Sequence, residues 1–237
     1  MISLSVIAAV IIALSGVCIM YLNDSYVADE KAIQAFSHME NISVDILPDE
    51  TIVYMPENPS AGFIFYPGGK VEYKSYEPLM KECASRGIAC FLVKAPFNLA
   101  VFRIDGAKGI QEKYTNINKW YIGGHSLGGS MASAYLAEAE EKYDGLILLA
   151  SYSSEDISQM DIDVVSIVGS EDKVLNKENY ESYRVNLPSS YEEEVIKGGC
   201  HSYFGVYGMQ EGDGTPDITN EEQIYLTADI IKEFFKK

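Results

Sequence analysis

Trp120-Tyr121-Ile122-Gly123-Gly124-His125-Ser126-Leu127-Gly128-Gly129 is the stretch that decides the fold, and the alanine-rich residues 130–137 follow it at once. The first four residues predict a short buried strand, and the residues after Ser126 predict a helix. On such a sharp strand-to-helix turn a serine hydroxyl stands clear of the backbone, and neighbouring chains come too close for β-carbons beside it. The Gly-x-Ser-x-Gly pattern at this junction predicts that Ser126 is a nucleophile; an ordinary helix N-cap is the competing interpretation.

Apolar runs and helical patterns alternate on both sides of this stretch. Strands are expected at 42–46, 51–55, 62–66, 88–93, 120–123, 145–150, 163–169 and 192–196. Helices are expected at 75–85, 99–113, 127–142, 177–185 and 221–235. Alternation at this spacing implies right-handed crossovers, so the sequence predicts an α/β fold with a doubly wound, mostly parallel sheet. Little room remains between residues 150 and 163 for a large cap domain.

Composition narrows the classes of partner and cofactor. The 237 residues are 47% hydrophobic, which suits one full-sized core. The formal net charge of −17 would repel phosphate backbones and argues against nucleic acid as a partner. The four cysteines show no Cys-x-x-Cys or Cys/His metal spacing, so we expect no metal and no organic cofactor. Cys83 and Cys90 are expected to be buried free thiols rather than a disulfide.

The N-terminus is apolar. Residues 2–23 carry no charge, and about 20 such residues suffice to cross a bilayer. A secretory signal peptide and a buried core helix are the alternatives, but no convincing cleavage site follows and the segment precedes every motif, so a membrane anchor is favoured. The predicted organisation is an anchor or signal at 1–23, a linker with a short helix at 24–41 and a catalytic domain at 42–237. The acidic flank from Asp24 to Glu30 favours an extracytoplasmic domain, which would be secreted if the leader were cleaved.

A serine nucleophile needs a general base, and histidine is scarce. The chain has His38, His125 and His201 alone. His38 precedes the sheet, and the side chain of His125 should point away from Ser126 into a packing or hydrogen-bonding role. His201 follows the last predicted strand, where the base is required, and is therefore the predicted base.

The acid that orients this base should come between the serine and the histidine in the chain. Asp172 lies three residues after the strand that ends at Gly169 and is the predicted acid. Glu171 is its near rival, and Glu155 and Asp156 are weaker ones; a solvated acidic loop is the plain alternative for each.

An oxyanion hole is the remaining requirement. One backbone N–H is expected from Leu127, directly after the serine. The other should come from the turn Pro67-Gly68-Gly69-Lys70 after the third strand, with Gly69 favoured and Lys70 as the alternative.

Four segments extend the pattern from a motif to a family resemblance. They are 66–71 (YPGGKV), 95–101 (APFNLAV), 123–129 (GGHSLGG) and 201–214. Together they resemble the α/β-hydrolase superfamily from about residue 42 to the C-terminus, and within it a compact bacterial group, often membrane-anchored, of the dienelactone-hydrolase-like branch (α/β-hydrolase fold-5). The resemblance implies Ser126, Asp172 and His201 as a catalytic triad. The chain departs from that group at Cys200 and Val206, where Asn and Asp are expected, so loop hydrogen bonds cannot be carried over.

Two functions follow from these residues. The first is a membrane-tethered hydrolase that cleaves a carboxylic ester or related acyl bond of a small molecule through an acyl-enzyme, with peptidase, thioesterase and acyltransferase activities left open. The second is a non-catalytic binding or scaffold protein that retains the fold, because a fold alone does not establish function.

Overall fold

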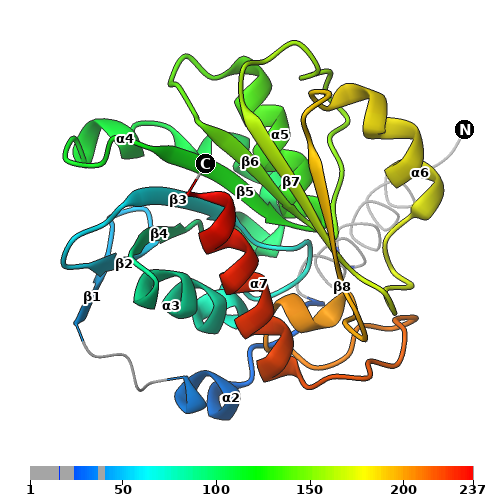
Figure 1. Ribbon diagram of the computed structural model, residues 1–237. Coiled ribbons are helices and arrows are strands. Elements are labelled where there is room, and N and C mark those ends of the chain that lie inside the picture. Colours follow the sequence, from blue (N-terminus) through cyan, green and yellow to red (C-terminus); the bar gives the residue numbers. More distant parts are fainter. Residues whose placement is uncertain (1–15, 17–23, 37–40, 237) are drawn as a thin grey trace, which may run out of the picture.

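Eight strands form one sheet in this computed structural model, which describes residues 16, 24–36 and 41–236 (Figure 1). The strands are β1 (Ile42–Ile46), β2 (Ile52–Pro56), β3 (Ala61–Tyr66), β4 (Ile88–Leu92), β5 (Trp120–His125), β6 (Gly145–Leu149), β7 (Asp163–Gly169) and β8 (Glu192–Ile196). Their order is β1-β2-β4-β3-β5-β6-β7-β8; β2 is antiparallel to both of its neighbours, and all other pairs are parallel. The predicted doubly wound, mostly parallel sheet is confirmed, and no large cap is present in the described part of the chain.

Helices cover both faces of the sheet. They are α2 (Glu30–Ala35), α3 (Glu77–Ser85), α4 (Ile110–Lys113), α5 (Leu127–Glu138), α6 (Lys177–Ser182) and α7 (Asn220–Phe234). Short 3₁₀ turns lie at Tyr73–Tyr76, Pro96–Asn98, Ala100–Phe102, Ile104–Ala107, Tyr183–Asn186 and Ser202–Phe204. Figure 1 shows α3 and α7 side by side on one face, and their side chains share one core cluster, whereas α5 belongs to the other.

The central strand β3 shows why the sequence forms two cores. Its side chains alternate between the faces of the sheet, as in any strand. Phe63 and Phe65 join the cluster under α3 and α7, and Ile64 and Tyr66 join the cluster under α5. Every residue of β3 is buried, so the strand reads as a continuous apolar run.

The predicted helix at 99–113 is wrong. The segment instead forms separate 3₁₀ turns followed by the short α4. Arg103 has φ −154°, outside the helical region, and Gly109 has φ 72°. The hydroxyl of Tyr66 donates to the Ile104 carbonyl and accepts the Ala107 N–H. These two backbone groups therefore do not form the i to i−4 hydrogen bonds of an α-helix. The predicted extension of the next helix to 142 is also too long, because Ala139 is already extended.

Two predictions concern residues that are not described. The proposed anchor at 2–23 lies outside the described residues apart from Gly16, and His38 lies outside them as well. Within the described residues, none of the helices combines the length and apolar character needed to span a bilayer.

Candidate active site

Ser126 sits between β5 and α5 on a strained backbone. Its φ of 51° and ψ of −124° are rare for a residue with a β-carbon. The hydroxyl of Ser151 donates to the Ser126 carbonyl at 2.6 Å and holds the turn from the next strand. A β-carbon on Gly124 or Gly128 would lie only 2.4 or 2.2 Å from the carbonyl oxygen of Tyr66. The two glycines of the motif are therefore required by the close approach of β3.

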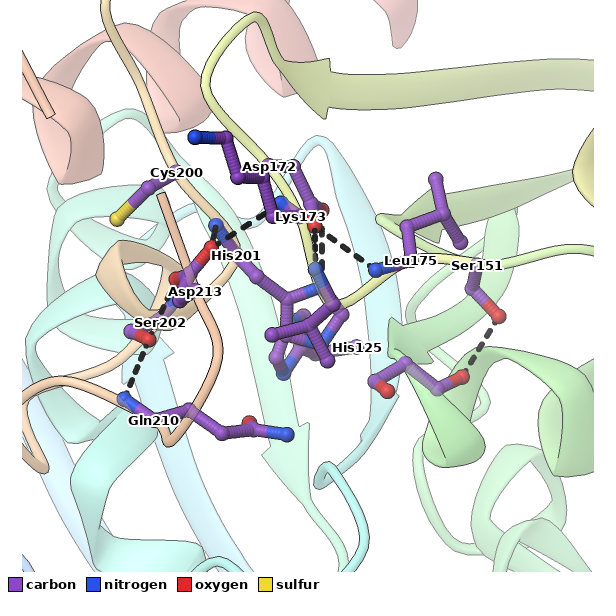
Figure 2. A network of polar contacts seen from close by, with 12 residues as sticks. His125, Ser151, Asp172, Lys173, Leu175, Cys200, His201, Ser202, Gln210 and Asp213 are labelled. Atoms are coloured by element: carbon purple, nitrogen blue, oxygen red, sulfur yellow. Dashed lines mark hydrogen bonds and ion pairs between the residues drawn. The ribbon is translucent and has the colours of Figure 1, made fainter. Parts of the chain in front are cut away.

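The predicted acid and base meet. His201 Nδ1 is 2.8 Å from Asp172 Oδ2, and both side chains are almost completely buried. The other carboxylate oxygen, Oδ1, accepts the N–H groups of Val174 and Leu175 at 2.9 Å each. Because the carboxylate accepts the Nδ1 proton, Nε2 of His201 is left as the basic nitrogen. Figure 2 shows the Asp172 carboxylate between the His201 ring and the backbone of its own loop.

The rival carboxylates do not reach the histidine. Glu171 accepts a hydrogen bond from the neighbouring Ser170 hydroxyl, and Glu155 and Asp156 are exposed. Nε2 of His201 is buried without a hydrogen-bond partner among the described residues, so the Ser126 hydroxyl is not bonded to it. Such hydrogen bonds are often long in free enzymes and shorten when substrate binds. Ser126, Asp172 and His201 follow β5, β7 and β8, and thus share the carboxyl edge of the sheet.

Asp213 holds the histidine loop and was missed by the sequence reasoning. Its Oδ2 accepts the N–H of Ser202 at 2.8 Å and the Ser202 hydroxyl at 2.6 Å (Figure 2). Its Oδ1 accepts the N–H groups of Lys173 and Gly214. Burial disfavours the ionised carboxylate, but these hydrogen bonds outweigh it and lower the pKa of Asp213. One side chain therefore ties the residue after the predicted acid to the residue after the predicted base.

His125 has a hydrogen-bonding and packing role, as predicted. Its Nδ1 accepts the hydroxyl of Tyr76 at 2.7 Å, and that hydroxyl in turn accepts the N–H of Gly68 at 3.1 Å. The rings of His125 and His201 lie 4.4 Å apart. Burial, and secondarily the nearby His201, hold the pKa of His125 well below its ordinary value, so it is neutral.

The same contacts bear on the predicted oxyanion hole. The N–H of Gly68 is used by Tyr76, and the N–H of Lys70 donates to the Asn98 carbonyl at 2.7 Å. The N–H of Gly69, between them, has no hydrogen-bond partner among the described residues. A β-carbon on Gly69 would lie 2.8 Å from the side chain of Leu127, so the two predicted donors are neighbours. Leu127 opens α5, where N–H groups lack helical partners.

A small cavity of about 240 Å³ adjoins the serine. It is lined by Ser126, Leu127, Ser130, Ala150, Ser151, Tyr152, Val174, Leu175 and Asn176. Pockets for drug-sized ligands span roughly 300–1,000 Å³. Two larger hollows of about 840 and 860 Å³ contain none of the three predicted catalytic residues. The space beside Ser126 thus suits a small group.

The described residues include three cysteines, and none of these is in a disulfide. Cys83, Cys90 and Cys200 are buried free thiols, as expected for the first two. Burial, and then the charge of Asp213, raise the pKa of Cys200 to about 12. Among the described residues, no group of three or more His, Cys, Asp or Glu side chains is arranged to hold a metal ion.

The chain matches a known protein family. Residues 62–225 match the family described as Alpha/beta hydrolase family, over more than half of the chain. The chain belongs to the alpha/beta hydrolase family. A search of curated proteins found no match to this chain.

Solved structures share the fold of this alpha/beta hydrolase. A dienelactone hydrolase from Anabaena variabilis aligns with a TM-score of 0.60 and 14% identity over 83% of this chain and 98% of its own. A carboxyl esterase 2 from Tuber melanosporum aligns with a TM-score of 0.59 and 12% identity over 90% and 91% of the two chains. An esterase domain from Rhodothermus marinus has a TM-score of 0.58 and 11% identity over 81% and 96%. At these identities the likeness establishes the fold alone.

Proposed function

We propose that this alpha/beta hydrolase is a serine hydrolase that cleaves a carboxylic ester or related acyl bond of a small molecule. The observation that carries the proposal is the buried Asp172–His201 pair at the same sheet edge as the strained turn of Ser126. The esterases and the dienelactone hydrolase that share the fold support this reaction class.

The chemistry begins with acylation. His201 Nε2 takes the proton of the Ser126 hydroxyl as Oγ attacks the acyl carbon, and Asp172 stabilises the resulting imidazolium. The N–H groups of Leu127 and Gly69 would donate to the oxyanion of the tetrahedral intermediate, each worth about 3 kcal/mol. His201 then gives the proton to the leaving alcohol, and an acyl-serine remains.

Deacylation repeats these steps with water. His201 takes a proton from water as its oxygen attacks the acyl carbon, and returns that proton to Ser126 as the carboxylic acid departs. No redox or metal step is needed for this cycle.

The cavity bears on the size of the acyl group. A volume of about 240 Å³, lined by Tyr152 and Leu175 among others, has room for a short acyl chain. The N-terminal segment bears on location: we infer that residues 2–23 anchor the protein in a membrane, with the domain on the extracytoplasmic side.

The test is hydrolysis of p-nitrophenyl esters from acetate to decanoate, beside an amide and a thioester, by the wild type and Ser126→Ala. We expect the highest kcat/KM for chains of two to four carbons, and a loss of about 10⁴-fold or more in Ser126→Ala. A folded wild type without activity on any of these substrates would instead favour a binding or scaffold protein.

A further inference from the structure

Apolar side chains are exposed in the loop that follows β4. Phe97, Val101, Phe102 and Ile104 are 52, 42, 55 and 39% exposed. The other seven of the nine phenylalanines are buried. Single exposed apolar residues are normal on a protein surface, but four within eight residues, with both exposed phenylalanines among them, form a concentration that needs an explanation.

The backbone of this loop carries strain. Phe97 has φ 56°, in the left-handed region, which costs a bulky residue about 1–2 kcal/mol. The Phe97 ring meets the Phe102 ring edge to face, with centroids 5.9 Å apart. The strained backbone thus holds two exposed aromatic rings together. Backbone strain of this kind is concentrated at functional sites.

The N-terminal segment reaches the domain beside the same loop. The N–H of Tyr26 donates to the Lys70 carbonyl at 2.7 Å, and the Asp24 carboxylate lies 3.0 Å from Lys70 Nζ. Lys70 also donates its N–H to the Asn98 carbonyl, and Ser25 and Asn98 line one hollow. The point where the chain joins the domain is therefore next to the residue that follows Phe97.

Chain length then limits how far this loop lies from the end of the apolar segment. Residues 2–23 carry no charge and suffice to span a bilayer. A chain advances at most about 3.5 Å per residue, so Ser25 lies within about 10 Å of the end of that segment. The headgroup layer on each side of a bilayer is roughly 5–8 Å thick. A segment that spans the bilayer brings the loop beside Asn98 to the headgroup layer.

Charges around the loop indicate which lipid it suits. Residues 97–102 have no charged side chain. The cations on either side are paired, Lys94 with Glu50 and Arg103 with Asp49. Anionic lipids are recognised by unpaired clusters of Lys and Arg, which this loop lacks. The loop therefore matches a zwitterionic surface.

We propose that the 97–104 loop is seated in the surface of a zwitterionic phospholipid bilayer, with the rings of Phe97 and Phe102 at the boundary between headgroups and acyl chains. Aromatic side chains favour this depth. The N–H of Lys70 donates to the Asn98 carbonyl, and Lys70 directly follows Gly69. The Gly69 side of the active site would therefore also face the lipid. The contact rests on the membrane anchor inferred above but not on hydrolase activity; only its consequence, that acyl substrates reach Ser126 from the lipid phase, rests on the proposed reaction.

The test uses tryptophan fluorescence of the full chain in phosphatidylcholine vesicles that contain phosphatidylcholine brominated on its acyl chains. The wild type has a single tryptophan, Trp120, which is buried at the amino end of β5, opposite the serine edge. Phe102→Trp reports on the loop, and Asn118→Trp, at an exposed position beside Trp120, is the matched control. We expect brominated lipid to reduce the emission added by Phe102→Trp at least twofold and to leave Asn118→Trp and the wild type unchanged.

Three results would overturn the proposal. They are equal quenching at the two positions, no quenching at position 102 in protein that floats with the vesicles, and failure of the protein to float with them. The second would mean that another occupant, such as residues 2–23 or a second copy, covers the loop. Phe97→Trp repeats the measurement in case Phe102→Trp does not fold. Labelling of Ser126 by a fluorophosphonate in the same vesicles reports on the proposed function separately.

Discussion

The turn at Ser126 and the loop at His201 are held in place by different means. The turn is determined by backbone geometry, since β3 leaves no room for β-carbons at Gly124 and Gly128. The histidine loop depends on side chains: Asp213 binds the backbone of Ser202 and Lys173. The proposed nucleophile is thus held by the packing of its turn against the sheet, whereas the proposed base is positioned by a polar network that can be altered one group at a time.

Gln223 adds a second polar contact to the histidine loop, and a ring contact joins this loop to the turn. Gln223 of α7 pairs with both backbone groups of Cys200, accepting its N–H at 2.9 Å and donating to its carbonyl at 2.8 Å. His125, in the turn, contacts the His201 ring. The contrast therefore predicts large effects on catalysis from the histidine side and large effects on folding from the turn.

Removing the charge of the acid should have the largest effect. In Asp172→Asn the amide no longer accepts the Nδ1 proton as a carboxylate does, and we expect kcat on p-nitrophenyl acetate to fall about 10⁴-fold, the magnitude known for this change in serine proteases. The unfolding midpoint should change little by comparison.

Glu171→Gln is the matched control for that variant. Among the described residues the Glu171 side chain bonds only to Ser170 in its own loop, so kcat should stay within about threefold of the wild type. Equal losses in the two variants would remove the distinction between these neighbouring carboxylates.

Crowding the turn should affect folding next. In Gly128→Ala the new β-carbon would meet the carbonyl oxygens of Tyr66 and Pro67, and we expect a loss of at least about 2 kcal/mol in the free energy of unfolding, measured with urea. In Gly109→Ala no atom lies within 4 Å and the strain comes from φ alone, so about 1 kcal/mol is expected. A smaller loss at position 128 than at 109 would contradict a turn held by backbone contacts.

Loosening the histidine loop should have a moderate effect. Asp213→Asn replaces one of two accepting oxygens by an NH₂ group that faces N–H donors, and we expect kcat to fall about tenfold, since hydrogen bonds to charged groups contribute roughly 1.5–3 kcal/mol. Simple destabilisation would instead lower the unfolding midpoint and leave the kcat of the folded protein unchanged. Asp217→Asn, an exposed position in the same segment, should leave both quantities unchanged.

The last prediction concerns pH and His125. A histidine whose folded pKa is lowered is protonated more readily in the unfolded chain, so stability is complete above pH 6.5 and declines as pH falls below it. One such group contributes a slope of at most about 1.4 kcal/mol per pH unit. We expect the loss of stability between pH 7 and pH 5 to be smaller in His125→Gln than in the wild type, by urea unfolding at each pH. Parallel pH dependences would mean that His125 titrates normally.

The site positions that could be predicted from the sequence are those set by local pattern. Ser126 lies at a strand-to-helix junction with flanking glycines, and three histidines left a single candidate after the last strand. Asp172 and Glu171 could be ranked only by spacing, because the direction of a side chain in a loop depends on its backbone turn. The hydrogen bonds to His201 and Leu175 now separate them.

The errors arose where distant contacts decide the structure. The apolar residues of the 99–113 segment have helical spacing, but the Tyr66 hydroxyl from β3 forms hydrogen bonds with two of its backbone groups. Asp213 lies in a segment without periodicity, and its role depends on contacts with Lys173 and Ser202. The only local signal was a carboxylate between two glycines, Gly212 and Gly214, of which Gly214 packs against the Glu171 carbonyl.

The central claim is that Ser126 is a nucleophile activated by His201. A fluorophosphonate probe, followed by intact mass and peptide mapping of the full chain, tests it most directly. We expect one adduct per chain, at Ser126, that is absent in Ser126→Ala and forms much more slowly in Asp172→Asn. A folded wild type that remains unlabelled, or an adduct that maps to Ser151 or another residue, would contradict it.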